Sequence, residues 1–192
     1  MTSRPGDGRS AVGLHSMAFS KSEIDALIRS LGVLVIDNSQ FMRKILRNLL
    51  LNVGVKEIHE ASDGIAGLEA IREIVPDIVI LDWELPLLNG AELARIVRSP
   101  GVFPTPNVPI IMLSSYGERG RVLEAARIGV NEYLVKPISA QALLDRMVSI
   151  LVKPRPIVRR GDYYGPEPRR RQISDPVRKP VIVVAAEDTP IT

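Results

Sequence analysis

Residues 76–90 read PDIVILDWELPLLNG, and this segment indicates the architecture of the chain most clearly. It contains an uninterrupted apolar run, IVIL at 78–81, which ends on Asp82. Continuous apolar runs of this length are typical of strands that are buried on both faces, as in parallel sheets covered by helices. The stretch therefore predicts a buried strand over residues 77–81, with an aspartate directly after it.

Strand-like and helix-like segments alternate on both sides of this strand. The expected strands are 33–36, 56–60, 77–81, 109–113 and 132–135, and the expected helices are 21–31, 39–53, 63–73, 91–98, 118–128 and 139–151. Gly54 and Gly129 stand where a helix can end in a left-handed conformation before the next strand begins. This alternation predicts an α/β fold with a five-stranded, parallel, doubly wound sheet.

The composition bounds the chemistry that is available. At 192 residues, with 45% hydrophobic and 24% charged residues, the chain can form one ordinary domain with a sizeable core. Because it has no cysteine, disulfide scaffolds, thiolate zinc sites, iron–sulfur clusters and cysteine nucleophiles are all excluded. Its two histidines, His15 and His59, are too few for a histidine-rich metal site.

The two ends of the chain differ in composition from its middle. Residues 1–20 are rich in Ser, Gly and Arg and predict a flexible tail, followed by a short leading helix at 21–31 and one domain at 32–152. Residues 153–192 hold the basic excess and nearly half of the 15 prolines. We expect this last segment to be a disordered, Pro/Arg-rich basic tail rather than a second domain.

Binding roles for this tail are limited to short motifs. The segment RRGDYYGPEPRRRQ permits contact with nucleic acid or an acidic protein, but a solvated tail is favoured and we do not expect a nucleic-acid partner. The apolar VIVVAA at 181–186 is suited to adding a strand to a partner's sheet or to docking back on the domain. No apolar run reaches the length of about 20 residues that spans a bilayer, so we expect a cytoplasmic protein without membrane insertion.

Polar residues follow four of the expected strands, and these residues indicate the functional site. Asp37 follows VLVI, Asp82 follows IVIL, Ser114 follows IIML, and Lys136 follows YLV. Because parallel strands all point the same way, residues beyond their carboxyl ends meet along one edge of the sheet, where ligands bind. A single polar residue after a strand is usually a helix cap or a solvated loop residue. Four such residues, each after a different strand, are much harder to explain by chance.

These four groups favour phosphoryl chemistry. Two neighbouring carboxylates repel each other, so a divalent cation or the Lys136 ammonium is the natural third member. Oxygen ligands favour Mg²⁺, which binds a few carboxylates together with a phosphoryl group and retains several waters. Lys136 and the Ser114 hydroxyl are then placed to hold the other phosphoryl oxygens, and an aspartate is a competent nucleophile for an acyl phosphate.

Several segments together resemble the receiver domain of bacterial response regulators, in particular the single-domain chemotaxis regulators. They are VLVIDNSQFMRKILRNLL, ASDGIAGLEAI, PDIVILDWELPLLNGAEL, VPIIMLSS and NEYLVKPISAQALL, which span Val33 to about Leu151. The resemblance implies a flavodoxin-like sheet of strand order 2-1-3-4-5. It also implies a partner histidine kinase or histidine phosphotransfer protein and an unidentified downstream protein, with the domain acting as a switch more than as an enzyme.

The resemblance also implies roles for particular residues. Asp82 is implied as the acceptor of phosphate from a phosphohistidine, Asp37 and a backbone carbonyl near Glu84 as Mg²⁺ ligands, Ser114 as the switch hydroxyl, Lys136 as the phosphate-binding ammonium, and Tyr133 as the rotating switch aromatic. Family members usually carry two adjacent acids after the first strand, and the second of them is a direct metal ligand. Here that position is Asn38, whose amide oxygen coordinates without a charge, so we expect weaker Mg²⁺ binding unless Glu84 supplies a replacement carboxylate.

Two other functions stay open on these residues. Asn38 and the basic tail allow a pseudo-receiver that acts as a phosphorylation-independent scaffold for an acidic protein or a nucleic acid. A small phosphatase of the haloacid type, which also uses an aspartate nucleophile, is disfavoured because Glu84 stands where its second aspartate is expected.

Overall fold

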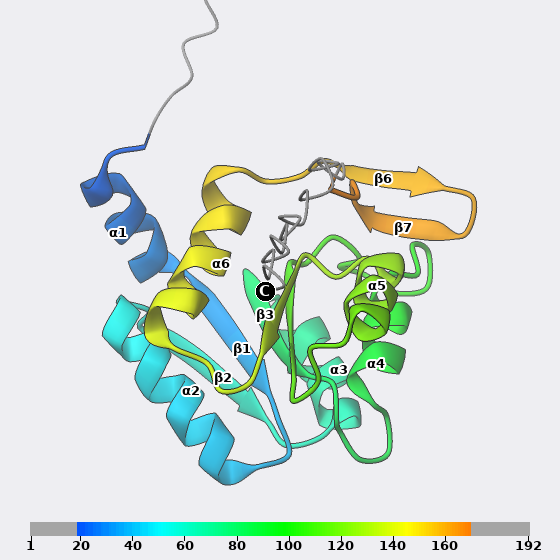
Figure 1. Cartoon of the computed structure of the whole chain (residues 1–192), viewed down its shortest axis with the longest axis horizontal. Helices are drawn as coiled ribbons and strands as arrows, with labels where there is room; N and C mark the ends of the chain where they lie inside the picture. The colour runs from blue at the N-terminus through cyan, green and yellow to red at the C-terminus, as the bar shows by residue number, and fades with distance from the viewer. Residues whose placement is uncertain (1–18, 170–192) are drawn as a thin grey trace, which may run out of the picture.

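The computed structural model describes residues 19–169, and its centre is a parallel sheet (Figure 1). The strands are β1 (Gly32–Ile36), β2 (Glu57–Ala61), β3 (Ile78–Asp82), β4 (Ile110–Ser114) and β5 (Glu132–Val135). Their order in the sheet is β2-β1-β3-β4-β5, and every neighbouring pair is parallel. The predicted α/β class, the five strands and the order 2-1-3-4-5 are therefore confirmed.

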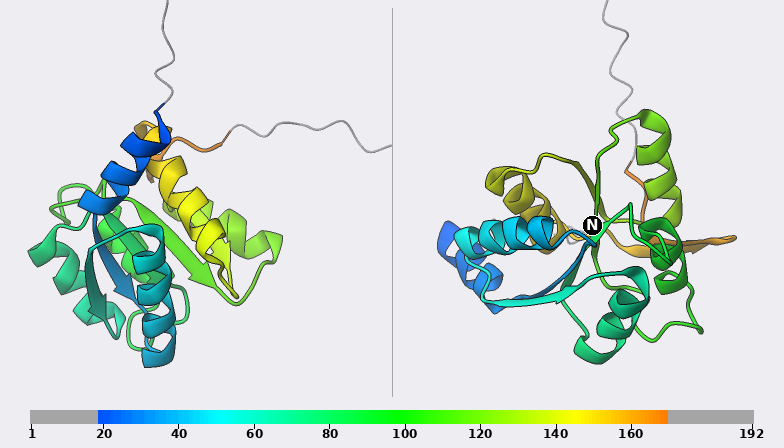
Figure 2. Two further views of the ribbon diagram at one scale, coloured as in Figure 1. Left: turned by 90° about the vertical axis from the view of Figure 1, so that its left-hand side faces the viewer. Right: turned by 90° about the horizontal axis from the view of Figure 1, so that it is seen from below.

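Helices cover both faces of this sheet (Figure 2). They are α1 (Lys21–Ser30), α2 (Gln40–Val53), α3 (Gly64–Ile74), α4 (Gly90–Val97), α5 (Arg119–Ile128) and α6 (Ala140–Val152). Side chains of α1, α2 and α6 pack with one set of strand residues, and those of α3, α4 and α5 pack with the other set. The central strands β1, β3 and β4 are buried along their whole length, which explains their continuous apolar sequences.

The helix ends are set by local signals that also shape the loops beside the sheet edge. Ser39 caps α2 by accepting from the Met42 N–H, and Asp63 caps α3 by accepting from the Ala66 N–H. At the other end, α2 and α5 stop at Gly54 and Gly129, with φ of 108° and 96°. Both glycines adopt the left-handed conformation that their sequence positions predict.

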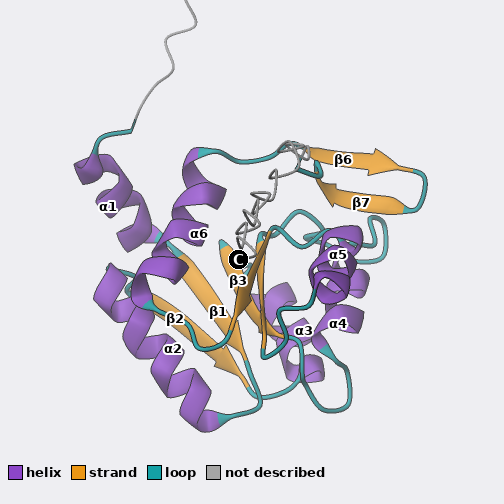
Figure 3. Ribbon diagram, viewed as in Figure 1, coloured by secondary structure: helices purple, strands orange, loops and turns teal. Residues whose placement is uncertain are grey.

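The segment after α6 differs from the expected tail. Residues 153–169 continue into an antiparallel hairpin of β6 (Ile157–Arg160) and β7 (Tyr163–Pro166), drawn beside α5 in Figure 3. The prediction of a disordered tail beginning at residue 153 is wrong for this part. Its proline and arginine content resembles that of disordered segments, and contacts with distant parts of the chain give it order.

The hairpin docks where α5 turns into β5. Arg155 donates to the Asn131 carbonyl, Arg169 pairs with the buried Glu132 carboxylate, and the Tyr164 hydroxyl donates to the Asn107 side chain at 2.6 Å. Each partner lies between 24 and 57 positions away in the sequence from the residue that contacts it, so no local sequence pattern predicts these contacts.

The predictions for residues 1–18 and for the VIVVAA segment at 181–186 lie outside the described residues. Within residues 19–169, no helix combines the length and the apolar character that crossing a membrane requires.

Candidate functional site

The carboxyl edge of the sheet brings together the four polar residues that the sequence singled out. Asp37 directly follows β1, Asp82 ends β3, Ser114 ends β4, and Lys136 directly follows β5. The Lys136 ammonium lies 3.1 Å from Oδ2 of Asp37 and 2.9 Å from Oδ1 of Asp82. The residues Asp37, Asp82 and Ser114 are almost completely buried, with exposures of 1%, 3% and 0%. One cation therefore bridges two buried carboxylates.

Burial and charge together set the protonation behaviour of this cluster. Burial raises the pKa of Asp82, and the nearby Asp37 and Glu84 carboxylates raise it further, while Lys136 opposes them. Burial would lower the pKa of Lys136, but the Asp82 and Asp37 carboxylates outweigh it and the pKa rises. The Lys136 side chain is therefore protonated at neutral pH. Although it contacts both buried aspartates, its single positive charge offsets only one negative charge.

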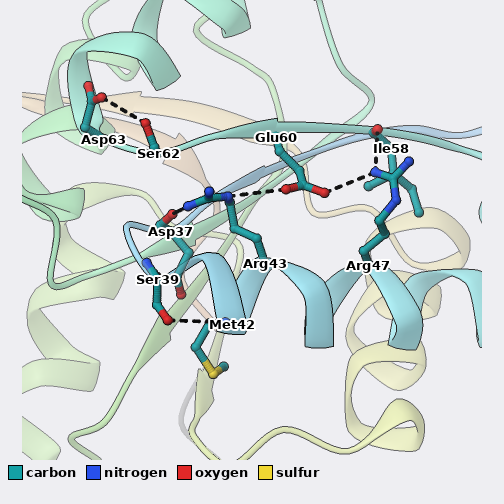
Figure 4. A network of polar contacts seen from close by, with 9 residues as sticks. All are labelled: Asp37, Ser39, Met42, Arg43, Arg47, Ile58, Glu60, Ser62 and Asp63. Carbon is teal, nitrogen blue, oxygen red and sulfur yellow. Dashed lines mark hydrogen bonds and ion pairs between the residues drawn. The ribbon is translucent and has the colours of Figure 1, made fainter.

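The first of these aspartates is held by its own loop. The Asp37 Oδ1 atom accepts from the Ser39 N–H at 2.8 Å, which fixes the carboxylate at the start of α2. Figure 4 shows that Arg43 reaches from α2 to the Asp37 carbonyl, at 2.7 Å, and pairs with Glu60 at 3.3 Å. No local sequence pattern indicates this positioning role of Arg43, because Glu60 lies on β2 and becomes a neighbour only in the folded sheet.

The arrangement of oxygen atoms fits a Mg²⁺ ion. Oδ1 of Asp82 is buried and contacts Lys136 as an ion pair, yet no residue of the described chain makes a well-aligned hydrogen bond to it. Asn38 is exposed beside Asp37 and offers an amide oxygen. Buried carboxylate oxygens beside an exposed amide oxygen suit Mg²⁺, which takes oxygen ligands and retains part of its hydration shell on the solvent side. Asp37, Asp82, Asn38 and the Glu84 carbonyl are therefore the residues that would hold the ion.

The number of acids at this edge is small for a metal site. Residues 19–169 contain no cluster of three or more His, Cys, Asp or Glu side chains able to hold a metal ion. The Glu84 carboxylate is directed to Ser114, whose hydroxyl donates to its Oε1 atom at 3.1 Å. If the Glu84 carboxylate is to replace the missing acid at position 38, it must first give up its hydrogen bond with Ser114.

Adding a charge at position 38 tests this account of the metal affinity. Asn38→Asp is expected to tighten Mg²⁺ binding by about tenfold, because a carboxylate replaces a neutral amide beside the ion. The measurement is a Mg²⁺ titration followed by the fluorescence of Trp83, the single tryptophan, next to Asp82. Glu84→Gln, which removes the side-chain charge and keeps the backbone carbonyl, is the matched variant. An affinity that neither substitution changes would contradict both the effect assigned to Asn38 and the hypothesis that the Glu84 carboxylate compensates for it.

The switch residues predicted from the resemblance lie beside this cluster. The Ser114 hydroxyl also accepts from the Tyr116 N–H at 3.1 Å, and the Tyr133 hydroxyl donates to the Tyr116 carbonyl at 2.6 Å. Tyr133 packs edge-on against Trp83, with ring centroids 6.4 Å apart. The guanidinium of Arg121 lies 4.7 Å from the Trp83 ring centroid and 5.3 Å from that of Tyr116. No local sequence pattern indicates this aromatic packing around Arg121 either.

A 2-1-3-4-5 parallel sheet whose carboxyl edge gathers two buried aspartates, a hydroxyl and a lysine defines a receiver domain, the phosphoaspartate signalling module of two-component systems. The chain belongs to this family, since the family model described as "Response regulator receiver domain" matches residues 33–148.

Several relatives of this chain are chemotaxis proteins. Chemotaxis protein CheY-3 of Vibrio cholerae is 32% identical over 124 residues, which cover 65% of this chain and 94% of the relative. Chemotaxis protein CheY of Pseudomonas aeruginosa is 34% identical over 118 residues, covering 62% and 94%. Among solved structures, the CheX-CheY-BeF3-Mg²⁺ complex from Borrelia burgdorferi matches with a TM-score of 0.59 and 27% identity, covering 64% of this chain and 90% of the matched chain.

Proposed function

We propose that this protein is a phosphoacceptor response regulator that takes a phosphoryl group on Asp82 from a histidine kinase or a histidine phosphotransfer protein. The observation that carries this proposal is the Lys136 ammonium, which lies within 3.1 Å of both buried aspartates and so forms a ready site for phosphoryl oxygens. A cytoplasmic location, expected from the sequence, stays a prediction.

In the proposed transfer, an oxygen of the Asp82 carboxylate attacks the phosphorus atom of the donor's phosphohistidine. A phosphorus–oxygen bond forms as the phosphorus–nitrogen bond breaks, and the electron pair of the broken bond returns to the imidazole. When bound, Mg²⁺ supplies positive charge that offsets the negative charge of the phosphoryl oxygens. Asp37, Asp82, Asn38 and the Glu84 carbonyl would hold that ion, and the Lys136 ammonium would contact a phosphoryl oxygen through a charge-assisted hydrogen bond.

Phosphorylation would act as a switch through Ser114. A phosphoryl group carries about 1.5 to 2 negative charges and three strong acceptor oxygens at neutral pH. It therefore competes with Glu84 for the Ser114 hydroxyl, which now donates to that carboxylate. Because Ser114 also accepts from Tyr116, whose carbonyl holds Tyr133, a shift of Ser114 would reach the outer surface around α5, β5 and α6 and change which downstream protein binds there.

One observation favours a second candidate, the phosphorylation-independent scaffold. The position beside Asp37 is an exposed, neutral asparagine, and the described chain lacks a cluster of three acids for the metal. A domain with this site would present the same surfaces without being phosphorylated.

Chemical labelling separates these two functions. Incubation with acetyl phosphate and Mg²⁺ is expected to give a phosphorylated wild-type protein, visible by intact-mass spectrometry as one added phosphoryl group. Asp82→Ala is the control and should carry no label, because the acceptor oxygen is gone. An unlabelled wild type that is folded and binds Mg²⁺ would support the scaffold instead.

A further inference from the structure

A groove on the outer surface of the domain is separate from the Asp82 site. It has a volume of about 810 Å³ and lies between α4, α5 and the β6–β7 hairpin. Its charged and aromatic lining residues are Arg95, Arg98, Glu124, Arg127, Asp162 and Tyr164. The last two belong to the hairpin, which lies beyond the region that the receiver family model matches. The added segment therefore supplies one wall of a site that the matched region does not complete.

Arg98, at the end of α4, is a buried cation without a buried anion. Only 4% of this residue is exposed, and its guanidinium donates to the Gly129 carbonyl at 2.8 Å, the Pro106 carbonyl at 2.6 Å and the Asn131 side-chain oxygen at 2.9 Å. All three acceptors are neutral, and no carboxylate in residues 19–169 pairs with this arginine.

This charge persists at neutral pH. Burial lowers the pKa of Arg98 to about 10, which still leaves the guanidinium protonated under ordinary conditions. A guanidinium has five N–H donors, and three of those on Arg98 are used by the neutral acceptors within the described chain. Buried charges in proteins are normally paired, so an uncompensated guanidinium that lines a groove indicates a missing anion.

The surrounding charges favour an anionic ligand. Arg127 lines the groove from α5 and forms no ion pair within the part of the chain that the structure describes. Arg95 is already neutralised by Glu124, at 2.9 Å. Asp162 is the other acidic residue of the lining, and its one negative charge faces the two unpaired guanidinium groups of Arg98 and Arg127. The groove therefore carries a net positive charge.

We propose that this groove binds a small phosphoryl-bearing ligand, whose phosphoryl oxygens contact Arg98 and Arg127. A phosphoryl group matches two guanidinium groups in charge and in number of acceptors better than a carboxylate does. The groove is far larger than one phosphoryl group and within the size range of small-molecule sites, so the rest of the ligand lies along α5 and the Tyr164 ring. Binding would also hold the hairpin against α5.

The test uses pyrophosphate as the probe and nuclear magnetic resonance of the full chain in EDTA, which prevents Mg²⁺-dependent binding at Asp82. The expected result is a saturable shift of the Nε–H signal of Arg98 and of the backbone signals of Gly120 and Gly129, which lie in or beside the groove. Arg127→Gln should weaken the affinity by at least about fivefold, because one charge-assisted contact is lost. Arg29→Gln removes the same charge from an exposed position on α1, which packs on the opposite face of the sheet from α4 and α5, and should leave the affinity unchanged.

Three outcomes would overturn the proposal. The groove signals do not move up to millimolar pyrophosphate, or they move equally in Arg127→Gln and Arg29→Gln, which indicates general charge screening. Alternatively, acetate at the same ionic strength gives the same shifts with the same affinity, which means that the groove takes any small anion.

Discussion

Lys136→Met is expected to lower the free energy of unfolding by about 2–4 kcal/mol at neutral pH, because the substitution leaves two buried carboxylates without their shared cation. The lysine lies 3.1 Å from Asp37 and 2.9 Å from Asp82, and its side chain is only 17% exposed, so water compensates little of this loss. Phosphorylation of Asp82 by acetyl phosphate should also slow by at least about tenfold, since one charge-assisted contact to the phosphoryl oxygens disappears.

The loss of stability should depend on pH in a definite direction. Lys136 is the group that holds down the pKa of Asp82, which burial and the neighbouring acids already raise, so its removal raises that pKa further. A carboxyl whose pKa is higher in the folded than in the unfolded state favours folding when protonated. The variant should therefore recover stability as the pH falls through the raised pKa of Asp82 and lose it as the pH rises.

Urea unfolding at pH 5, 7 and 8.5 measures this dependence. The double variant Lys136→Met with Asp82→Asn is the matched control, because it removes the second carboxylate together with the cation. It should be more stable than Lys136→Met at pH 8.5 and show a much flatter pH dependence. Equal pH dependence in the single and double variants would show that Asp82 is not the group that Lys136 compensates.

Gly129→Ala is expected to lower the free energy of unfolding by about 3 kcal/mol. The loss has two causes, backbone strain and a steric clash. A residue with a side chain is strained at φ 96°, and its Cβ would lie 2.5 Å from the Tyr164 carbonyl oxygen and 3.3 Å from the Gly165 Cα atom. Both contacts are with the backbone of β7, which cannot move aside without loosening the hairpin.

Gly54→Ala separates the strain from the clash. Gly54 also ends a helix in the left-handed conformation, at φ 108°, but a Cβ there would have its nearest neighbour at 3.8 Å. Its cost should be the conformational strain alone, about 1 kcal/mol. Equal losses at positions 54 and 129 in denaturant unfolding would show that hairpin docking contributes nothing to the stability of the domain.

The sheet was predictable from the sequence because its signals are local. The runs that became β1, β3 and β4 are apolar throughout, since both faces of these strands are covered by helices. Ser39, Asp63, Gly54 and Gly129 marked helix ends within one or two residues, because caps act through backbone groups only a few positions away.

The gathering of Asp37, Asp82, Ser114 and Lys136 was also predictable, for a topological reason. Parallel strands end at one edge, so a polar residue after each strand is placed near the others once the sheet is parallel. The direction of each side chain was not predictable. That the Glu84 carboxylate accepts from Ser114 depends on how the loop after β3 folds back across β4.

The sheet, its helices and the residues of its functional edge follow from local sequence patterns, because strand periodicity, caps and parallel topology are encoded by neighbours in the chain. The hairpin and the environment of Arg98 depend instead on contacts that form only in the folded chain. Arg155, Arg169 and Tyr164 find partners more than 20 positions away, and Arg98 reaches a carbonyl 31 positions along the chain. Contacts of that range leave no periodic trace, since their energy depends on where the folded sheet places each partner.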